Sequence, residues 1–480
     1  MLCLEVPMRI EHDFIGELEL ADDAFYGVQT FRARNNFDIT GEHLSDYPGF
    51  IYGYAKVKKA AALANCALGL LDREKCDFIC KACDEVLTGK YNDQFVVDML
   101  QGGAGTSTNM NCNEVIANVA LTLMGHNKGE YQYLHPNDHV NLSQSTNDSY
   151  PTAIKIALYD DIGRLFAAIA LLRDAFYRKA DEFKDVIKMG RTQLQDAVPM
   201  TVGQEFHAFG TMLDADLNNL GIARQAMLHI NMGGTAIGTG INSHPDYAAT
   251  VCRYLREITG DDFVTEQDLV AATPDCSGYV HVMSALKQLA LKLSKTCNDL
   301  RLLSSGPRCG LNEINLPKMQ PGSSIMPGKV NPVIPEVVNQ VCFHVIGADV
   351  AVNFAAEAGQ LQLNVMEPAI AYEIFKSIKM LDRALRTLAE KCVDGITVNK
   401  EVCLDFVLGS IGIVTALNPY IGYENSASIA KECLATGKRV REVALERGLL
   451  TEEQIDELLT PENMLNPKLS AESRAHYKQR

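Results

Sequence analysis

The feature that most constrains this chain is a set of largely apolar side chains at heptad spacing between residues 282 and 303. Steps of four and three alternate along this set, which places its members on one face of an α-helix. Residues 160–180 repeat apolar side chains at similar steps. The first set is Val282, Leu286, Leu289, Leu293, Thr296, Leu300 and Leu303, and the second is Ile162, Leu165, Phe166, Ile169, Leu172 and Phe176. Both stretches predict long helices that pack against other helices.

A third stretch, residues 337–356, is apolar on nearly all sides of a helix. Such a helix is predicted to be buried on every side. Strand patterns are few and short, and no alternation of strands with helices indicates a doubly wound sheet. We therefore expect an all-α, mainly helical fold built on a bundle of long helices, which other subunits could complete. A monomeric α-solenoid is the alternative, but no repeat period of about 20–50 residues supports it.

Charge and hydropathy exclude some classes of function. The net charge of −16 argues against a nucleic-acid partner, because phosphate binding uses clustered Lys and Arg. No apolar run approaches the roughly 20 residues that span a bilayer, so we expect no membrane association. The chain of 480 residues is long enough for about two to four compact units.

The N-terminus and the cysteines bear on location. The first residues show no basic segment followed by an apolar one, so no signal peptide is predicted. Met8 is a candidate natural start, which would make residues 1–7 an extension. The 14 cysteines are scattered from Cys3 to Cys433, a distribution typical of reduced thiols in a cytoplasmic protein.

The most informative segment for chemistry is residues 322–332, which read Gly-Ser-Ser-Ile-Met-Pro-Gly-Lys-Val-Asn-Pro. Lys329 and Asn331 could converge on one carboxylate, and a serine near a cation could act as a base. The surrounding stretch, 305–332, is long and rich in Gly, Pro and Ser, so we expect a mobile loop with a function. A solvated linker is the alternative for a generic loop of this kind.

Three further segments accompany this loop. They are residues 103–111 (Gly-Ala-Gly-Thr-Ser-Thr-Asn-Met-Asn), 135–141 (His-Pro-Asn-Asp-His-Val-Asn) with 143–148 (Ser-Gln-Ser-Thr-Asn-Asp), and 190–197 (Gly-Arg-Thr-Gln-Leu-Gln-Asp-Ala). Together with the loop they resemble the motifs of the fumarase/aspartase superfamily, and the resemblance extends from about residue 11 to about residue 427. Members of that superfamily eliminate across the Cα–Cβ bond of succinyl compounds and release fumarate.

The resemblance implies a fold as well as a reaction. It implies three mostly helical domains, here residues 1–146, 147–401 and 402–480. The central domain would supply five long helices to a twenty-helix core in a homotetramer. Each active site would be assembled from three subunits, which explains why the polar motifs lie so far apart in the sequence.

The resemblance also implies a role for each motif residue. Removing the Cβ proton of aspartate creates an aci-carboxylate with a second negative charge, which preorganised donors in a dry site stabilise. By its position in the motif, the resemblance implies that Ser323 is the catalytic base, with Ser324 as its rival. Lys329 and nearby loop amides would provide the means to favour the alkoxide. The residues expected to bind substrate are Thr106, Ser145, Thr146, Asn147, Thr192, Ser324, Lys329 and Asn331, the last two at the α-carboxylate.

Gln193 separates branches of the superfamily. Fumarases carry histidine at this position for proton handling, whereas glutamine cannot shuttle a proton at neutral pH. A protonated amino group leaves as ammonia without an added acid, but hydroxide leaving malate needs an acid. We therefore expect reversible elimination of ammonium from L-aspartate, with no cofactor required. Class II fumarase and a catalytically inactive structural relative remain the alternatives, and the intact motif residues disfavour the second.

A second site is a further expectation. In relatives, the stretch that contains His135, Asn137 and Asp138 forms a second dicarboxylate site away from the catalytic one. Some aspartases also respond to divalent metal. We therefore keep an activator site at these residues as an expectation, allow activation by a divalent metal, and predict no metal centre for catalysis.

Two other patterns are set aside. Cys76, Cys80 and Cys83 have a spacing that iron–sulfur enzymes use. The same spacing is one face of an amphipathic helix, which is the interpretation we favour. The Gly-rich segment 233–240 neither follows a strand nor matches G-x-G-x-x-G, so no dinucleotide site is expected there.

Overall fold

The computed structural model describes residues 7–465 of the chain. Helices dominate these residues and confirm the predicted all-α class. The described strands form four two-stranded sheets, β1–β2, β3–β4 and β7–β8 antiparallel and β5–β6 parallel. Their bounds are β1 (Met8–Asp13), β2 (Gly16–Ala21), β3 (Ile187–Thr192), β4 (Gln195–Thr201), β5 (His229–Ile230), β6 (Val264–Thr265), β7 (Ile314–Asn315) and β8 (Thr397–Val398).

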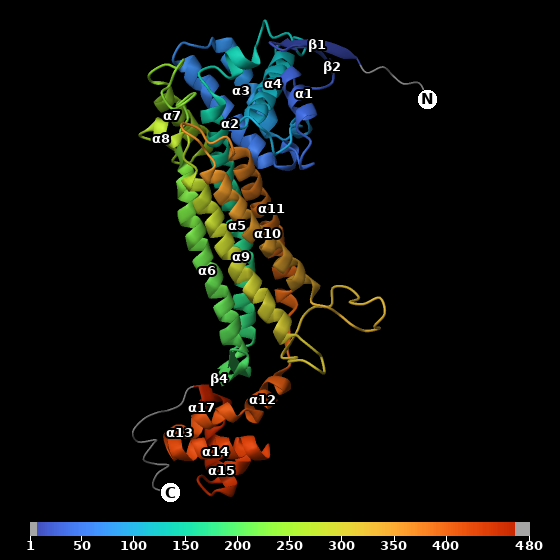
Figure 1. Ribbon diagram of the computed structural model, residues 1–480, viewed down its shortest axis with the longest axis vertical. Helices are drawn as coiled ribbons and strands as arrows, with labels where there is room; N and C mark the ends of the chain where they lie inside the picture. The colour runs from blue at the N-terminus through green and yellow to red at the C-terminus, as the bar shows by residue number, and fades with distance from the viewer. Residues whose placement is uncertain (1–6, 466–480) are drawn as a thin grey trace. The chain divides into compact units, whose positions relative to one another are not determined.

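Several long helices make up much of the described chain (Figure 1). In the described part, α5 has 37 residues, α6 has 24, α9 has 27, and α10 and α11 have 25 each. The helices are α1 (Val28–Asn36), α2 (Pro48–Ala67), α3 (Arg73–Leu87), α4 (Thr106–Leu123), α5 (Thr146–Glu182), α6 (Val202–Gln225), α7 (Tyr247–Thr259), α8 (Leu269–Ala272), α9 (Ser277–Leu303), α10 (Val333–Glu357), α11 (Glu367–Lys391), α12 (Lys400–Gly409), α13 (Val414–Ile421), α14 (Tyr423–Thr436), α15 (Val440–Glu446), α16 (Glu452–Leu458) and α17 (Pro461–Leu465). The predicted long helices are therefore present.

The chain divides into two compact units. Unit 1 comprises residues 1–167, 216–291 and 341–382, and unit 2 comprises residues 168–215, 292–340 and 383–480. Each of the five longest described helices contributes one segment to each unit. This division follows packing within the chain, and the three-domain boundaries implied by the resemblance stay a prediction.

The heptad set on α9 lies on one buried face, as predicted. Each of its seven side chains is at most 5% exposed. In unit 1, the Tyr279 hydroxyl donates to the Pro151 carbonyl of α5 at 3.2 Å, and Lys287 pairs with Asp349 of α10 at 2.6 Å. Because helices of this length gain most of their stability from an apolar face, the buried set holds α9 against its neighbours.

Helix α10 departs from the prediction of burial on every side. Val338, Val345 and Val352 are fully buried, but Phe343 and Phe354 are 61% and 71% exposed. By length and composition alone, this helix could cross a membrane. It also carries buried polar groups such as Asp349, which pairs with α9, as a core helix of a bundle does. Within one chain, the prediction therefore holds for one face and is wrong for the other.

The C-terminal helices of unit 2 have a core of their own. It includes Val407, Leu417, Ile429, Val443 and Ile455, each fully buried. Two side chains of β3, Ile187 and Met189, pack into the same core. The hairpin β3–β4, which carries the third motif, is thus anchored on these helices through its first strand.

The three closely spaced cysteines lie on α3, as the helical interpretation predicted. Cys76 and Cys83 are buried, and Cys80 is partly buried. The Cys76 thiol donates to the Ala62 carbonyl of α2 at 3.4 Å. Between residues 7 and 465, no group of three or more His, Cys, Asp or Glu side chains is arranged to hold a metal ion.

Candidate active site

The first motif forms a tight turn that leads into α4. Gly103, Ala104 and Gly105 have φ angles of +94°, +54° and +89°. Gly105 is required for packing as well as conformation, because a Cβ there would lie 2.3 Å from the Tyr150 ring. Thr106 follows as the exposed first residue of α4, and its hydroxyl donates to the Gly103 carbonyl at 2.8 Å. The turn therefore presents Thr106 at a helix N-terminus, where anions are favoured.

The second motif builds the N-terminus of α5. The Ser145 hydroxyl accepts from the Asn147 N–H at 3.2 Å, and the Asp148 carboxylate accepts from the Ser145 N–H at 2.9 Å. Burial raises the pKa of Asp148 to about 6. This reciprocal arrangement caps the helix and leaves Thr146 as its first residue.

The Gly-rich segment packs against this helix end. The backbone N–H groups of Gly233 and Thr235 donate to Asp148 at 3.0 and 3.2 Å. The Asn147 side-chain N–H donates to the Ala236 carbonyl at 2.7 Å. The segment that matched no dinucleotide pattern thus holds the end of α5, a role that sequence reasoning did not assign.

Asn109 joins the first and second motifs. Its Nδ2 donates to the Thr146 hydroxyl at 3.3 Å. Its Oδ1 accepts from Lys58 Nζ at 2.7 Å, and Asn141 Oδ1 and Gln144 Oε1 accept from the same nitrogen at 2.9 Å each. We call this set of four side chains the amide cage.

Lys58, at the centre of the amide cage, was missed by sequence reasoning. It lies on α2 and is fully buried. Burial lowers the pKa of Lys58 to about 7, whereas three amide oxygens, one for each N–H of an ammonium, favour the charged form. The cage fixes the orientation of Asn109, and through it the Thr146 hydroxyl.

The third motif is the tip of the hairpin β3–β4 in unit 2. Thr192 pairs with Gln195 across the turn. The turn residues Gln193 and Leu194 have φ angles of +53° and +62°, as a two-residue hairpin turn requires. Thr192 and Gln193 are exposed at this tip.

Buried and partly buried charged side chains connect β3 to two carboxylates. Arg191 pairs with Glu313 at 2.6 Å, and Lys188 pairs with Glu313 at 2.9 Å and with Glu205 at 2.7 Å. Burial raises the pKa of Glu205, with the neighbouring Lys188 opposing the shift. These two cations and two carboxylates, which we call the charge cluster, balance one another.

The fourth motif folds back on itself within unit 2. The Gly322 N–H donates to the Lys329 carbonyl at 2.8 Å, and Asn331 Nδ2 donates to the Gly322 carbonyl at 2.7 Å. The Ser323 hydroxyl oxygen accepts from the backbone N–H groups of Ile325 and Met326 at 3.2 and 2.9 Å. Two amide donors on one serine oxygen favour its alkoxide.

Ser323 and Lys329 line the same cavity, of about 500 Å³. The loop is largely exposed, and Ser324 and Lys329 are among its exposed residues. An anionic substrate held there would meet a cation and a serine oxygen with two amide donors, beside apolar side chains such as Met326 and Val330.

The structure therefore places the predicted residues in two sets. Unit 1 brings together the second motif and Asn109 of the first, at the adjacent starts of two helices. Unit 2 holds the hairpin tip, and the loop that carries both serines. The unit 1 set is Thr106, Ser145, Thr146 and Asn147, and the unit 2 set is Thr192, Ser323, Ser324, Lys329 and Asn331.

The residues of the expected second site lie in unit 1. The His135 ring accepts from the backbone N–H groups of Asn137 and Asp138 at 3.1 and 3.2 Å, so it caps a short turn. His135 and Asn137 line a cavity of about 380 Å³ that also contains Glu114. Three backbone N–H groups at the start of α1 donate to Glu114, which links this cavity wall to that helix.

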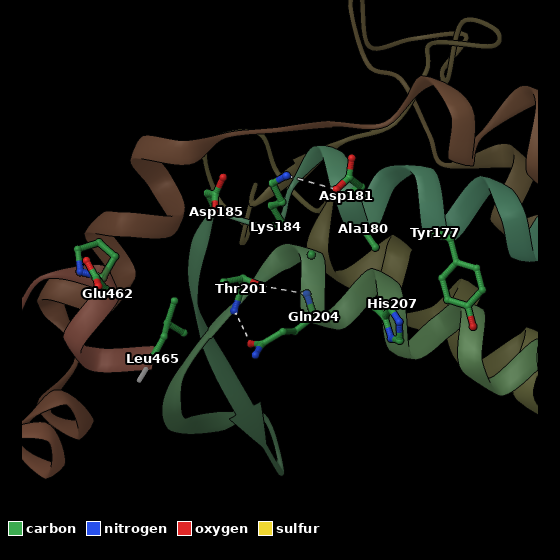
Figure 2. Close-up of a pocket in the computed structure, with 12 residues that line it drawn as sticks. Tyr177, Ala180, Asp181, Lys184, Asp185, Thr201, Gln204, His207, Glu462 and Leu465 are labelled. Atoms are coloured by element: carbon green, nitrogen blue, oxygen red, sulfur yellow. Dashed lines mark hydrogen bonds and ion pairs between the residues drawn. The ribbon is translucent and has the colours of Figure 1, made fainter. Parts of the chain in front are cut away.

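A larger cavity, of about 970 Å³, lies elsewhere in unit 2. Figure 2 shows Tyr177, Lys184 and His207 on its walls, with Lys184 paired to Asp181. None of the predicted site residues lines it. Size alone therefore does not locate the candidate site, which is defined by its polar groups.

Comparison with known proteins agrees with the motif geometry. Residues 16–347 match a family model described as lyase, and residues 413–466 match a model described as fumarase C C-terminus. The chain is 63% identical over 460 residues to an aspartate ammonia-lyase of Helicobacter pylori, covering 96% of this chain and 98% of the relative. It is 57% identical over 465 residues to an aspartate ammonia-lyase of Escherichia coli K12, covering 97% of each.

Solved structures are similar over the same length. A fumarate lyase:delta crystallin from Brucella melitensis bound to cobalt superposes with a TM-score of 0.94 at 50% identity, covering 96% of this chain and 100% of that chain. A recombinant class II fumarase from Schistosoma mansoni superposes with a TM-score of 0.90 at 34% identity, with the same coverage.

Proposed function

Because the chain belongs to the lyase family that contains the aspartate ammonia-lyases, we propose that it converts L-aspartate reversibly into fumarate and ammonium. It is a carbon–nitrogen lyase, as are relatives that are 57–63% identical to it over nearly the whole chain. The observation that carries the mechanism is the Ser323 hydroxyl oxygen, which accepts two backbone N–H groups in the loop that also bears Lys329.

Ser323 removes the Cβ proton in this proposal. An ordinary serine is too weak a base, so its alkoxide must be stabilised. The amides of Ile325 and Met326 supply fixed donors, and Lys329 adds a positive charge in the same cavity. The aci-carboxylate that forms is an oxyanion, for which each fixed donor in a dry site is worth about 3 kcal/mol.

In this proposal, side-chain hydroxyls and helix N-termini bind the substrate carboxylates. Thr106 and Thr146 are the first residues of α4 and α5, where the helix dipole favours an anion. Because the Thr146 oxygen accepts from Asn109, its own proton is left to donate to a carboxylate. Ser145 and Thr192 add hydroxyls, and Lys329 and Asn331 hold the α-carboxylate.

Asn147 recognises the leaving group in this proposal. Its Nδ2 is held by the Ala236 carbonyl, so the side chain offers its amide oxygen, an acceptor, to the departing ammonium. Gln193, at the hairpin tip, supplies no acid for a departing hydroxide. The protonated amino group departs as neutral ammonia, which then takes up a proton to give ammonium, and the proposed reaction therefore uses no general acid at the nitrogen.

The active form is proposed to be a homotetramer that assembles each site from three subunits. Support comes from α10, where Phe343, Val350 and Phe354 are 61%, 54% and 71% exposed at spacings of seven and four. A stripe of this kind is typical of a helix that packs on a partner. Light scattering should give about four times 52.7 kDa, and an active monomer would contradict the shared sites.

No cofactor is required by the proposed reaction, because Ser323 and fixed donors carry it. Activation by a divalent metal stays part of the proposal, and so does a second dicarboxylate or activator site at His135, Asn137 and Asp138, where a cavity adjoins the turn. We place the enzyme in the cytoplasm, in keeping with reduced thiols such as those of Cys76, Cys80 and Cys83.

The direct test is fumarate formation from L-aspartate by the purified protein, followed by absorbance, with ammonium measured in parallel. Equal amounts of both products support the proposal. Absence of turnover would favour the inactive structural relative, and turnover of L-malate alone would favour a fumarase.

A further inference from the structure

The charge cluster has residues in or near two candidate segments of unit 2. Lys188 and Arg191 lie on β3, which ends at Thr192. Glu313 directly precedes β7 and lies ten residues before Ser323. The cluster thus joins the strand that carries the third motif to the root of the loop that carries the proposed base.

Glu313 is the centre of the charge cluster. It is fully buried, and its two carboxylate oxygens pair with different cations, Oε1 with Arg191 at 2.6 Å and Oε2 with Lys188 at 2.9 Å. Lys188, which is 2% exposed, reaches Glu205 of α6 at 2.7 Å. One carboxylate therefore fixes two positions on β3, and the cluster ties that strand to α6.

The backbone of Glu313 is fixed as well. Its N–H donates to the Leu303 carbonyl at the end of α9, and its carbonyl accepts from the Asn399 N–H at 2.9 Å. The guanidinium of Arg191 lies 5.3 Å from the Phe406 ring centre on α12. These hydrogen bonds fix the backbone of Glu313, so its side chain can fix the position of β3.

Buried ion pairs contribute little net stability compared with apolar packing, and in some proteins they specify one geometry. We propose that Glu313 is a positioning residue for the elimination: through Arg191 and Lys188 it holds the Thr192 hairpin and the root of the Ser323 loop in one arrangement. This inference rests on the proposed function, because its readout is turnover of L-aspartate.

The test uses Glu313→Gln in the full-length protein, with Glu11→Gln as the matched control. Glu11 has the same side-chain exposure of 1% and pairs with Arg9 at 2.8 Å, but it lies on β1, outside both segments. Misplacement of reacting groups by about 1 Å costs roughly 100-fold in rate. We expect kcat for L-aspartate to fall about 10- to 100-fold in Glu313→Gln and less than about twofold in Glu11→Gln, both measured well below the melting temperature.

A double-mutant cycle separates positioning from loss of stability. Arg191→Gln alone should lower kcat, and the double variant with Glu313→Gln should lose no more than Glu313→Gln alone, because both changes break one connection. Independent losses that multiply would overturn the inference. If Glu313→Gln does not fold, Arg191→Gln carries the test, and normal kcat in that variant is the contrary result.

The outcomes distinguish the two proposals. A wild-type protein that forms no fumarate contradicts the proposed function. A wild-type protein that is active, with equal losses in Glu313→Gln and Glu11→Gln, contradicts only the positioning role.

Discussion

The amide cage of unit 1 and the loop 322–331 of unit 2 both carry predicted site residues, but they are built in opposite ways. In the cage, the fully buried Lys58 donates to three amide oxygens that come from distant parts of the chain. In the loop, most residues are exposed, and Ser323 bonds to amides only two and three residues away.

The difference assigns separate tasks to the two regions. A network of long-range partners around a buried lysine holds Thr146 in place, so in the proposed site unit 1 supplies a preformed binding surface. A loop whose hydrogen bonds are local can move as a body without breaking the contacts of its own serine. Changes in the cage should therefore reduce stability most, and changes in the loop should reduce turnover most.

The largest expected effect is on the loop side of this comparison. Ser323→Ala should keep the fold and oligomeric state but lower kcat by several orders of magnitude, because the base is lost. The KM for L-aspartate should change far less. Steady-state kinetics check this, and Ser324→Ala, the rival position, should lower kcat much less. The reverse order would transfer the role of base to Ser324.

The next effect is on the cage. Lys58→Met removes a donor from the buried Asn109 oxygen and from the partly buried Asn141 and Gln144 oxygens, so the free energy of unfolding should fall by about 3 kcal/mol. Lys59→Met is the control, since Lys59 pairs with Asp84 at the surface and should change stability by less than about 1 kcal/mol. Urea unfolding measures both. Equal stability of the two variants would show that the cage is not a structural network.

Two glycines test the difference in packing between unit 1 and the loop. Gly105 and Gly328 have similar φ angles, +89° and +82°, but a Cβ would lie 2.3 Å from Tyr150 at the first and meet nothing within 4 Å at the second. Alanine should cost about 1 kcal/mol at either position from backbone conformation. Gly105→Ala should cost about 1–3 kcal/mol more from overpacking. Urea unfolding that gives equal losses would contradict the tight packing assigned to unit 1.

Helical periodicity gave the long helices because it reports which side of a helix is apolar. Periodicity did not predict that Phe343 and Phe354 are exposed in this chain. The spacing of apolar residues is the same whether they pack on their own chain or on another chain. The motif residues were found by resemblance, and their hydrogen-bond partners were not.

The burial of Lys58 could have been predicted from the sequence. It shares a face of α2 with Tyr54, Ala61 and Asn65, each at most 1% exposed, so helical spacing alone would have placed it inside. Glu313 offered no such signal. It lies outside any helix and pairs with Arg191, 122 residues away, and a pairing of that kind leaves no local pattern.

The proposed site eliminates ammonia from L-aspartate and not water from L-malate. The decisive measurement is the ratio of kcat/KM for L-aspartate to that for L-malate. Acceptors arranged for an ammonium are left unsatisfied by a hydroxyl, and Gln193 supplies no acid. We expect L-aspartate to be favoured by at least about 100-fold, the scale of one hydrogen-bond discrimination of about 3 kcal/mol. Comparable values for the two substrates would contradict the assignment and point to a fumarase.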